Sequence, residues 1–167
     1  MSLCKTSGLA VVAALCLLGE ATSSAHAQCN SGCATEWSGG KVVNLGGASS
    51  LAYGINDAGQ VVGTKGPEAT EWSGGSVINL GGLLGARVSA PVSINDAGQA
   101  VGSSYTAEGV DQATEWSGGN VIDLGGLPGS TYAYAYGIND AGQVVGASQV
   151  RGTTYATEWS GGSIINL

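Results

Sequence analysis

The sequence predicts an all-β fold of antiparallel four-stranded sheets, each formed by one copy of an internal repeat. The phrase YGINDAGQVVG at residues 53–63 recurs unchanged at 136–146, and as VSINDAGQAVG at 92–102. The 30 glycines separate short segments rich in Val, Ile, Thr and Tyr, which is typical of strands and turns and unfavourable to helices. The four tryptophans stand in copies of a second phrase, ATEWSGG, at residues 34–40, 69–75, 113–119 and 156–162.

Residues 1–27 have the pattern of a signal peptide, so we expect the repeats to follow an N-terminal signal helix. Lys5 gives a positive start, residues 8–19 are apolar, and residues 25–27 (AHA) form a cleavage pattern of small residues. The mature chain would begin at Gln28 and be secreted, in the periplasm or outside the cell. A retained N-terminal anchor helix is the alternative.

The composition after the signal peptide disfavours several classes of partner and mechanism. Cleavage removes one acid, Glu20, and one base, Lys5, so the formal charge stays at −7. That charge disfavours nucleic acid and anionic membranes as partners. No later segment reaches roughly 18 consecutive apolar residues, so we expect no membrane association after cleavage. The only histidine, His26, also leaves, which excludes Ser-His-Asp and Cys-His catalysis in the mature chain.

Cys29 and Cys33, in the segment of residues 28–33, are the only thiols left after cleavage. An exported chain meets an oxidising compartment, so this pair predicts a small terminal disulfide, with an idle reduced pair as the alternative. A metal site would need two further ligands. We therefore expect neither a metal nor a cofactor.

The β-repeat domain, residues 34–167, divides into a half unit and three full units, and we expect 14 strands from it. A full unit carries four strand-length segments, which end in GIN, QVVG, ATEW and VINL or close variants, whereas the half unit carries only the last two. Four short antiparallel strands in about 43 residues are typical of a propeller blade. The units are the half unit 34–45 and the full units 46–80, 81–124 and 125–167.

One half unit and three full units predict a partial, β-propeller-like array of about 3.5 blades. Closing a ring would require one more GIN/QVVG hairpin. We therefore considered an arc with open edges, an assembly completed by another copy or by further repeats, and a fragment of a longer protein without independent function. The fragment is the favoured interpretation of the three.

The IND phrase predicts a type I turn closed by a glycine bulge, at residues 56–59, 95–98 and 139–142. Asn caps the turn with its side-chain oxygen, and Gly adopts the left-handed conformation. The alternative makes Asp57, Asp96 and Asp140 metal ligands or general acids. It is disfavoured because every unit carries the same single acid and the alternating acids of a calcium loop are missing.

In the ATEW strand, Thr and Trp are expected on one face, and Ala and Glu on the other. The tryptophan is interpreted as an apolar plate between neighbouring sheets, and a sugar-stacking platform is the alternative. The repeated glutamates are expected on a partly exposed edge strand, with a glycosidase-like pair as the alternative: Glu36, Glu71, Glu115 and Glu158.

The combination of Trp-x-x-Gly, a strand ending in Asn/Asp-Leu-Gly-Gly, and INDAGQVVG resembles the HAF-type extracellular repeat family of bacterial secreted proteins, over residues 34–167. The resemblance implies a secreted, propeller-like β-repeat with no established activity and no catalytic residues. The His-Ala-Phe triplet itself is substituted in every copy, so no role of that histidine is carried over: Cys33-Ala34-Thr35, Glu68-Ala69-Thr70, Gln112-Ala113-Thr114 and Tyr155-Ala156-Thr157.

We expect a non-catalytic scaffold or binding module, because the repeated residues are those that bend and pack the chain. Partner contacts would then lie in the variable loops, where tyrosines combine contact area with a hydroxyl. A hydrolase using carboxylates is the alternative, and Glu108 with Asp111 is its one unrepeated acidic pair. The candidate contact residues are Tyr105, Tyr132, Tyr134 and Tyr155.

Overall fold

The computed structural model describes residues 32–38 and 40–167, and this part of the chain is built of strands and turns without a helix. The all-β prediction is confirmed. The predicted signal peptide, residues 1–27, and Cys29 lie outside the described residues. The described residues, 32–38 and 40–167, contain no helix and therefore none long and apolar enough to cross a membrane.

The described strands form one two-stranded sheet and three four-stranded sheets, all antiparallel. Sheet A consists of β1 (Thr35–Ser38) and β2 (Lys41–Asn44). Sheet B consists of β3 (Ser50–Ile55), β4 (Val61–Lys65), β5 (Glu68–Ser73) and β6 (Ser76–Asn79). Sheet C consists of β7 (Ala86–Ile94), β8 (Ala100–Thr106), β9 (Asp111–Ser117) and β10 (Asn120–Asp123). Sheet D consists of β11 (Ser130–Ile138), β12 (Val144–Val150), β13 (Thr153–Ser160) and β14 (Ser163–Asn166).

Each predicted unit corresponds to one sheet, and the strands of each sheet are neighbours in chain order. Two-residue hairpins join the third and fourth strands, as in sheet B, where Ser73 pairs with Ser76 across two glycines with φ of 55° and 79°. The ATEW strand lies third in sheets B, C and D, with a partner on both sides. The predicted edge position of its glutamate is therefore wrong for Glu71, Glu115 and Glu158. Of the four ATEW strands, only β1, which bears Glu36, is an edge strand among the described residues.

The IND phrase forms the predicted turn. The Gly59 N–H donates to the Asn56 carbonyl at 3.0 Å, and Gly59 has a φ of 76°. The Asn56 side-chain oxygen accepts the Gln60 N–H at 2.9 Å, as predicted for a capping residue. The same bonds recur at residues 95–99 and 139–143.

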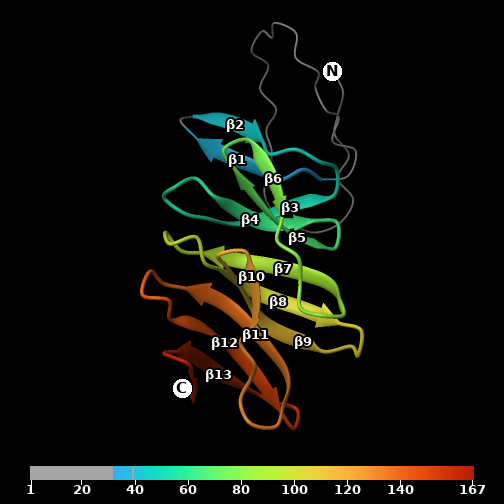
Figure 1. The fold of residues 1–167 in the computed structure, drawn as a ribbon, viewed down its shortest axis with the longest axis vertical. Helices are drawn as coiled ribbons and strands as arrows, with labels where there is room; N and C mark the ends of the chain where they lie inside the picture. The colour runs from blue at the N-terminus through green and yellow to red at the C-terminus, as the bar shows by residue number, and fades with distance from the viewer. Residues whose placement is uncertain (1–31, 39) are drawn as a thin grey trace, which may run out of the picture.

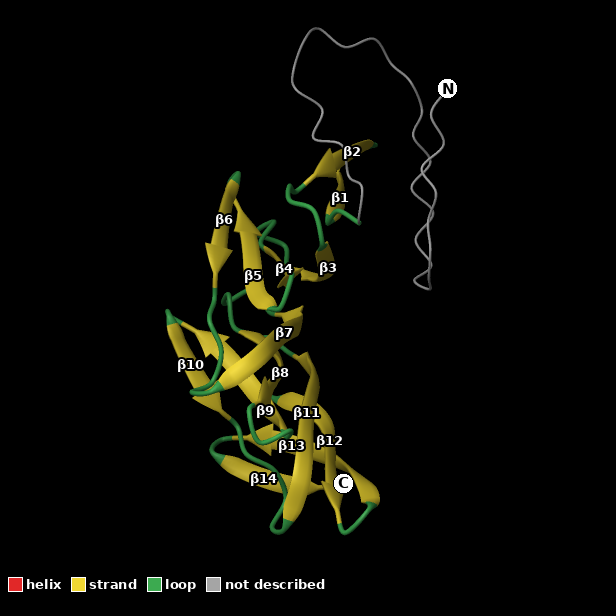
Figure 2. Ribbon diagram, turned by 90° about the vertical axis from the view of Figure 1, so that its right-hand side faces the viewer, coloured by secondary structure: helices red, strands yellow, loops and turns green. Residues whose placement is uncertain are grey.

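The sheets stack along the long axis of the molecule, with sheet A at one end and sheet D at the other (Figures 1 and 2). The first strand of each following sheet carries most of the packing. β7 lies against β3, β4 and β5 of sheet B, and β11 lies against β7, β8 and β9 of sheet C. The stack therefore depends on the GIN strand of each unit lying across the sheet before it.

The glycine of the QVVG strand is required by close backbone approach. The first strand of each full sheet changes register near its end, for example between Pro91 and Ser93 in β7. This irregularity brings the Ala90 carbonyl oxygen to within 1.9 Å of where a Cβ on Gly102 would lie. Gly63 and Gly146 have the same 1.9 Å approach to the equivalent oxygens. A side chain at these positions would displace the first strand.

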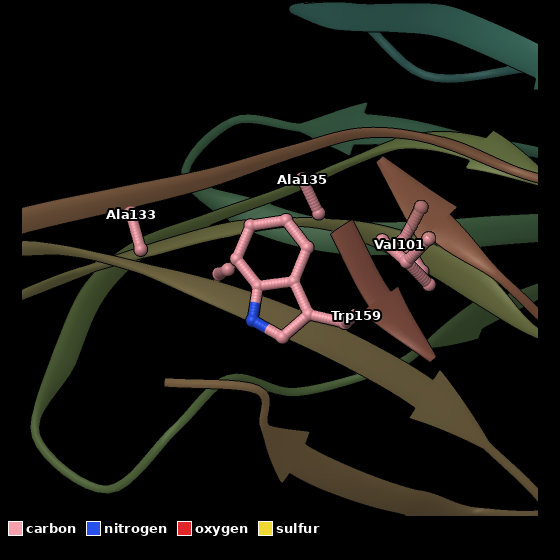
Figure 3. Packing of buried hydrophobic residues seen from close by; sticks show 6 residues of the cluster. Val101, Ala133, Ala135 and Trp159 are labelled. Atoms are coloured by element: carbon pink, nitrogen blue, oxygen red, sulfur yellow. The ribbon is translucent and has the colours of Figure 1, made fainter. Parts of the chain in front are cut away.

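The core consists of three clusters, one at each boundary between sheets. In each, the tryptophan of the following sheet meets a leucine and an alanine of the preceding sheet. Trp72 and Ala69 of one strand belong to different clusters, which confirms that they point to opposite faces. Figure 3 shows the cluster between sheets C and D, which contains Val101, Ala113, Ala133, Ala135, Val144 and Trp159.

The variable stretches that carry the candidate tyrosines, which we expected to be loops, form strands over much of their length. β7 and β11 each have nine residues, against six in β3. Extra residues therefore lengthen the strand pairs and satisfy backbone hydrogen bonds in the sheet. Consequently Tyr105, Tyr132, Tyr134 and Tyr155 all lie in strands.

Candidate functional site

The asparagines of the three IND turns form a hydrogen-bonded column that joins neighbouring sheets. The Asn56 side-chain amide donates to the Asn95 carbonyl at 2.9 Å, and the Asn95 amide donates to the Asn139 carbonyl at 3.0 Å. Asn56 and Asn95 are 9% and 4% exposed. Each buried amide thus finds its acceptor in the next repeat, which fixes the spacing between sheets.

The aspartates of the same turns form a second column beside the first. The Asp57 N–H donates to the Asp96 carboxylate at 2.9 Å, and the Asp96 N–H donates to the Asp140 carboxylate at 3.1 Å. Among the described residues, no three acids, cysteines or histidines are grouped as metal ligands. In this geometry the Asp96 and Asp140 carboxylates act as hydrogen-bond acceptors for the preceding repeat.

The repeated glutamine connects the turn to the ATEW strand. The Gln60 amide donates to the Glu71 carboxylate at 2.9 Å, while its side-chain oxygen accepts from the Asn56 amide at 2.8 Å. Equivalent glutamine–glutamate pairs have distances of 2.9 and 3.1 Å. The repeated glutamate therefore orients the glutamine, which in turn orients the asparagine of the column.

The tryptophans are buried in the three full sheets and exposed in sheet A. Trp72, Trp116 and Trp159 are 3%, 3% and 5% exposed, which contradicts a sugar-stacking platform for these three and confirms their predicted packing role. The Trp116 and Trp159 indole N–H groups donate to the backbone carbonyls of Gly81 and Gly125, the residues that begin their own units. Trp37 is 59% exposed, so the packing prediction is wrong for it. Among the described residues no sheet precedes sheet A, so this indole lacks the preceding sheet against which the other three tryptophans pack.

The Trp72 indole nitrogen is the one buried side-chain polar atom without a hydrogen-bond partner in the described part of the chain. The equivalent acceptor, the Gly46 carbonyl, accepts from the Ser50 hydroxyl at 3.2 Å instead. Sheet A is therefore seated on sheet B differently from the way the full sheets are seated on one another.

The two end faces of the stack expose apolar residues that the internal boundaries bury. Val62 and Val101 are fully buried, whereas Val145, at the equivalent position of sheet D, is 47% exposed. Leu167 is 69% exposed. A groove of about 360 Å³ lies on this face of sheet D, lined by Gly137, Ile138, Asn139, Gln143, Val145 and Glu158.

At the other end, a second groove of about 310 Å³ lies between sheets A and B. Ile55 in this groove is 55% exposed, although the equivalent Ile94 is only 8% exposed. Ile94 shares its cluster with Val62, which lies in β4, the QVVG strand of the preceding sheet. Among the described residues sheet A has no QVVG strand, and the Ile55 side chain is left exposed.

A row of tyrosines runs along β11, the first strand of sheet D, and we call Tyr132, Tyr134 and Tyr136 the tyrosine row. The Tyr134 and Tyr136 rings stack with their centroids 6.2 Å apart and an interplanar angle of 6°. The Tyr134 hydroxyl donates to the Asp111 carboxylate at 2.9 Å. Burial, followed by this bond and the charge of Asp111, raises the pKa of Tyr134 to about 12.

Sequence reasoning identified two members of this row and missed Tyr136, which is 60% exposed. Tyr136 is the first residue of the repeated phrase YGINDAGQVVG, which we interpreted only as a turn and its flanking strands. The alternation TYAYAYG at residues 131–137 was the available signal, because residues two apart lie on one side of a strand. The structure brings Tyr132 and Tyr134 together in the row, while Tyr105 lies on β8 and Tyr155 on β13.

The unrepeated acids Glu108 and Asp111 differ in their surroundings. Glu108 is exposed in the turn between β8 and β9, where hydrogen bonds from its own backbone and from Thr106 lower its pKa. Asp111 begins β9 and is engaged by Tyr134.

Cys33 is disulfide-bonded. Its predicted partner, Cys29, lies outside the described residues, so that pairing stays a prediction.

Comparison with protein-family models, curated proteins and solved structures finds no match for this chain. The resemblance to the HAF-type repeat family therefore stays a prediction from its motifs.

Proposed function

We propose that the chain is a non-catalytic extracellular β-repeat module, a scaffold that presents the tyrosine row to a binding partner. The observation that carries the proposal is the use of the repeated polar residues. The glutamates of the full sheets orient glutamines, and Asp96 and Asp140 accept backbone N–H groups from the neighbouring repeat. Residues with these structural roles are expected in every copy of a scaffold.

The architecture we propose is a partial β-propeller-like array of about 3.5 blades. Two features support it: each full unit is a four-stranded meander, and each first strand lies across the preceding sheet. Export, to the periplasm or outside the cell, is proposed from the signal-peptide pattern of residues 1–27.

The tyrosine row supports the binding role because it breaks the repeat. The positions of Tyr132 and Tyr134 are occupied in β7 by Val88 and Ala90. Stacked rings beside a carboxylate offer apolar faces together with hydroxyl and carboxylate groups, which suits a sugar or a short peptide.

The test is a glycan array and a peptide array probed with the purified full-length chain, beside a hydrolase screen of the same preparation. We expect binding that Tyr136→Ala abolishes and Tyr53→Ala leaves intact. Tyr53 is the matched control, because it holds the same position in sheet B and is 49% exposed. Binding to neither array would contradict the binding role, and turnover that disappears in Glu108→Gln would show a hydrolase instead.

A second candidate function, a section of a larger repeat assembly, is favoured by the exposed end faces. Val145 and Leu167 are exposed where their equivalents Val101 and Leu124 pack under the next sheet. Sedimentation of the purified chain over a range of concentrations tests this candidate. Self-association that weakens in Val145→Asp would support it, and a monomer at all concentrations would contradict assembly from copies of this chain.

A further inference from the structure

The free edge of β1 differs from the same edge in every full sheet. β5, β9 and β13 are each paired on both sides. One neighbour is the strand that follows in the chain, and the other is the QVVG strand, β4, β8 or β12. Within the described residues β1 pairs with β2 alone. In sheet B the first valine of the QVVG strand, Val61, lies opposite Trp72, so an added strand would place a valine opposite Trp37.

The groove beside this edge is lined like a boundary between two full sheets, except that the QVVG strand of the first sheet is missing from the described residues. It is lined by Thr35, Glu36 and Trp37 of β1, by residues 52–55 of β3, and by Val61. At the next two boundaries the second valine of QVVG, Val62 or Val101, shares a buried cluster with the isoleucine of the following sheet or packs against it. The groove lacks that valine, so a QVVG strand is the segment that matches its apolar part.

The polar groups of the groove match the same segment. In the full sheets the repeated glutamate accepts a hydrogen bond from the glutamine of its own turn at 2.9 to 3.1 Å. No described residue supplies that bond to Glu36. The Asn56 carbonyl and the Asp57 carboxylate likewise occupy the positions at which Asn95 and Asp96 accept from the preceding turn. An IND turn placed before sheet B would donate to all three groups.

We propose that the β1 edge and this groove form an acceptor for a β-hairpin of sequence Gly-Ile-Asn-Asp-x-Gly-Gln-Val-Val-Gly, supplied by another repeat-bearing chain. The hairpin completes sheet A by strand addition, in which backbone hydrogen bonds give affinity and side-chain pockets give specificity. This inference goes beyond the proposed function, because it uses the end of the stack opposite the tyrosine row.

The probe is a synthetic peptide with the sequence of residues 50–65, SLAYGINDAGQVVGTK, which contains no tryptophan. It is titrated into the full-length chain while tryptophan emission and acrylamide quenching are recorded. We expect a saturable blue shift and reduced quenching, because Trp37 passes from 59% exposed to covered. Trp37→Phe should remove the signal.

Matched variants test the proposed contacts. A peptide with alanine in place of its glutamine, and the protein variant Glu36→Ala, should each bind about tenfold more weakly, because each loses a hydrogen bond to a charged group. Glu158→Ala should leave binding unchanged, since Glu158 is already paired with Gln143. Tyr136→Ala should also leave it unchanged, which separates this test from that of the proposed function.

The proposal is overturned if the peptide shows no saturable binding. It is also overturned if Glu36→Ala and Glu158→Ala bind alike, or if the fluorescence change survives in Trp37→Phe, because either result places the peptide elsewhere.

Discussion

Truncating a buried valine and its exposed equivalent gives a quantitative test of sheet stacking. Val101 and Val145 occupy the same position of successive QVVG strands, but Val101 is fully buried and Val145 is 47% exposed. Both lie in second strands with a partner on either side. The effects of strand propensity and backbone entropy therefore cancel when Val101→Ala is compared with Val145→Ala.

The expected magnitudes follow from burial. Val101→Ala removes two buried methyl groups, worth about 0.8 kcal/mol each, and leaves a cavity, so the free energy of unfolding should fall by about 2 kcal/mol. Val145→Ala removes groups already half in water and leaves an open surface, so its cost should be below about 1 kcal/mol.

Urea unfolding followed by circular dichroism measures both values. The slope of the unfolding free energy against urea concentration should be the same for the two variants. Equal losses for the two variants, within about 0.5 kcal/mol, would refute the conclusion that sheet D covers Val101 while Val145 faces solvent.

Three further predictions use the same repeat logic. Asn95→Ala should lower the free energy of unfolding by about 1 kcal/mol more than Asn139→Ala, because only Asn95 donates to a following repeat; equal losses in urea unfolding would contradict the column. Gly102→Ala should cost several kcal/mol or prevent folding, since its Cβ would lie 1.9 Å from a backbone oxygen; a wild-type melting temperature would refute the close approach. The raised pKa of Tyr134 means that folding favours its protonated form, so stability should fall as pH rises from about 10 to about 12; absorbance at alkaline pH should show one late tyrosine, absent in Tyr134→Phe.

The turns and the number of strands could be predicted from the sequence because their chemistry is local. In residues 56–59 the capping asparagine and the left-handed glycine are read from four adjacent letters. The pairing of Gln60 with Glu71 could not be read in the same way. It depends on the register of β4 against β5, in which Val62 lies opposite Glu71.

Whether a residue is buried between two sheets or exposed at an end of the stack could not be predicted from the sequence either. Trp37 and Trp72 stand in identical phrases, yet one is exposed and the other is buried. The two tryptophans hold the same register position in their sheets, and the difference arises from whether another sheet packs against that position. Tertiary packing decides both, so identical letters do not imply identical environments.

A double-mutant cycle across one sheet boundary tests most directly the claim that the repeats exist to stack. Val62 of sheet B and Trp116 of sheet C share one buried cluster, whereas Trp159 belongs to the next. The account predicts a coupling of at least about 0.5 kcal/mol between Val62→Ala and Trp116→Phe, and additivity between Val62→Ala and Trp159→Phe. Additivity in both pairs would contradict it.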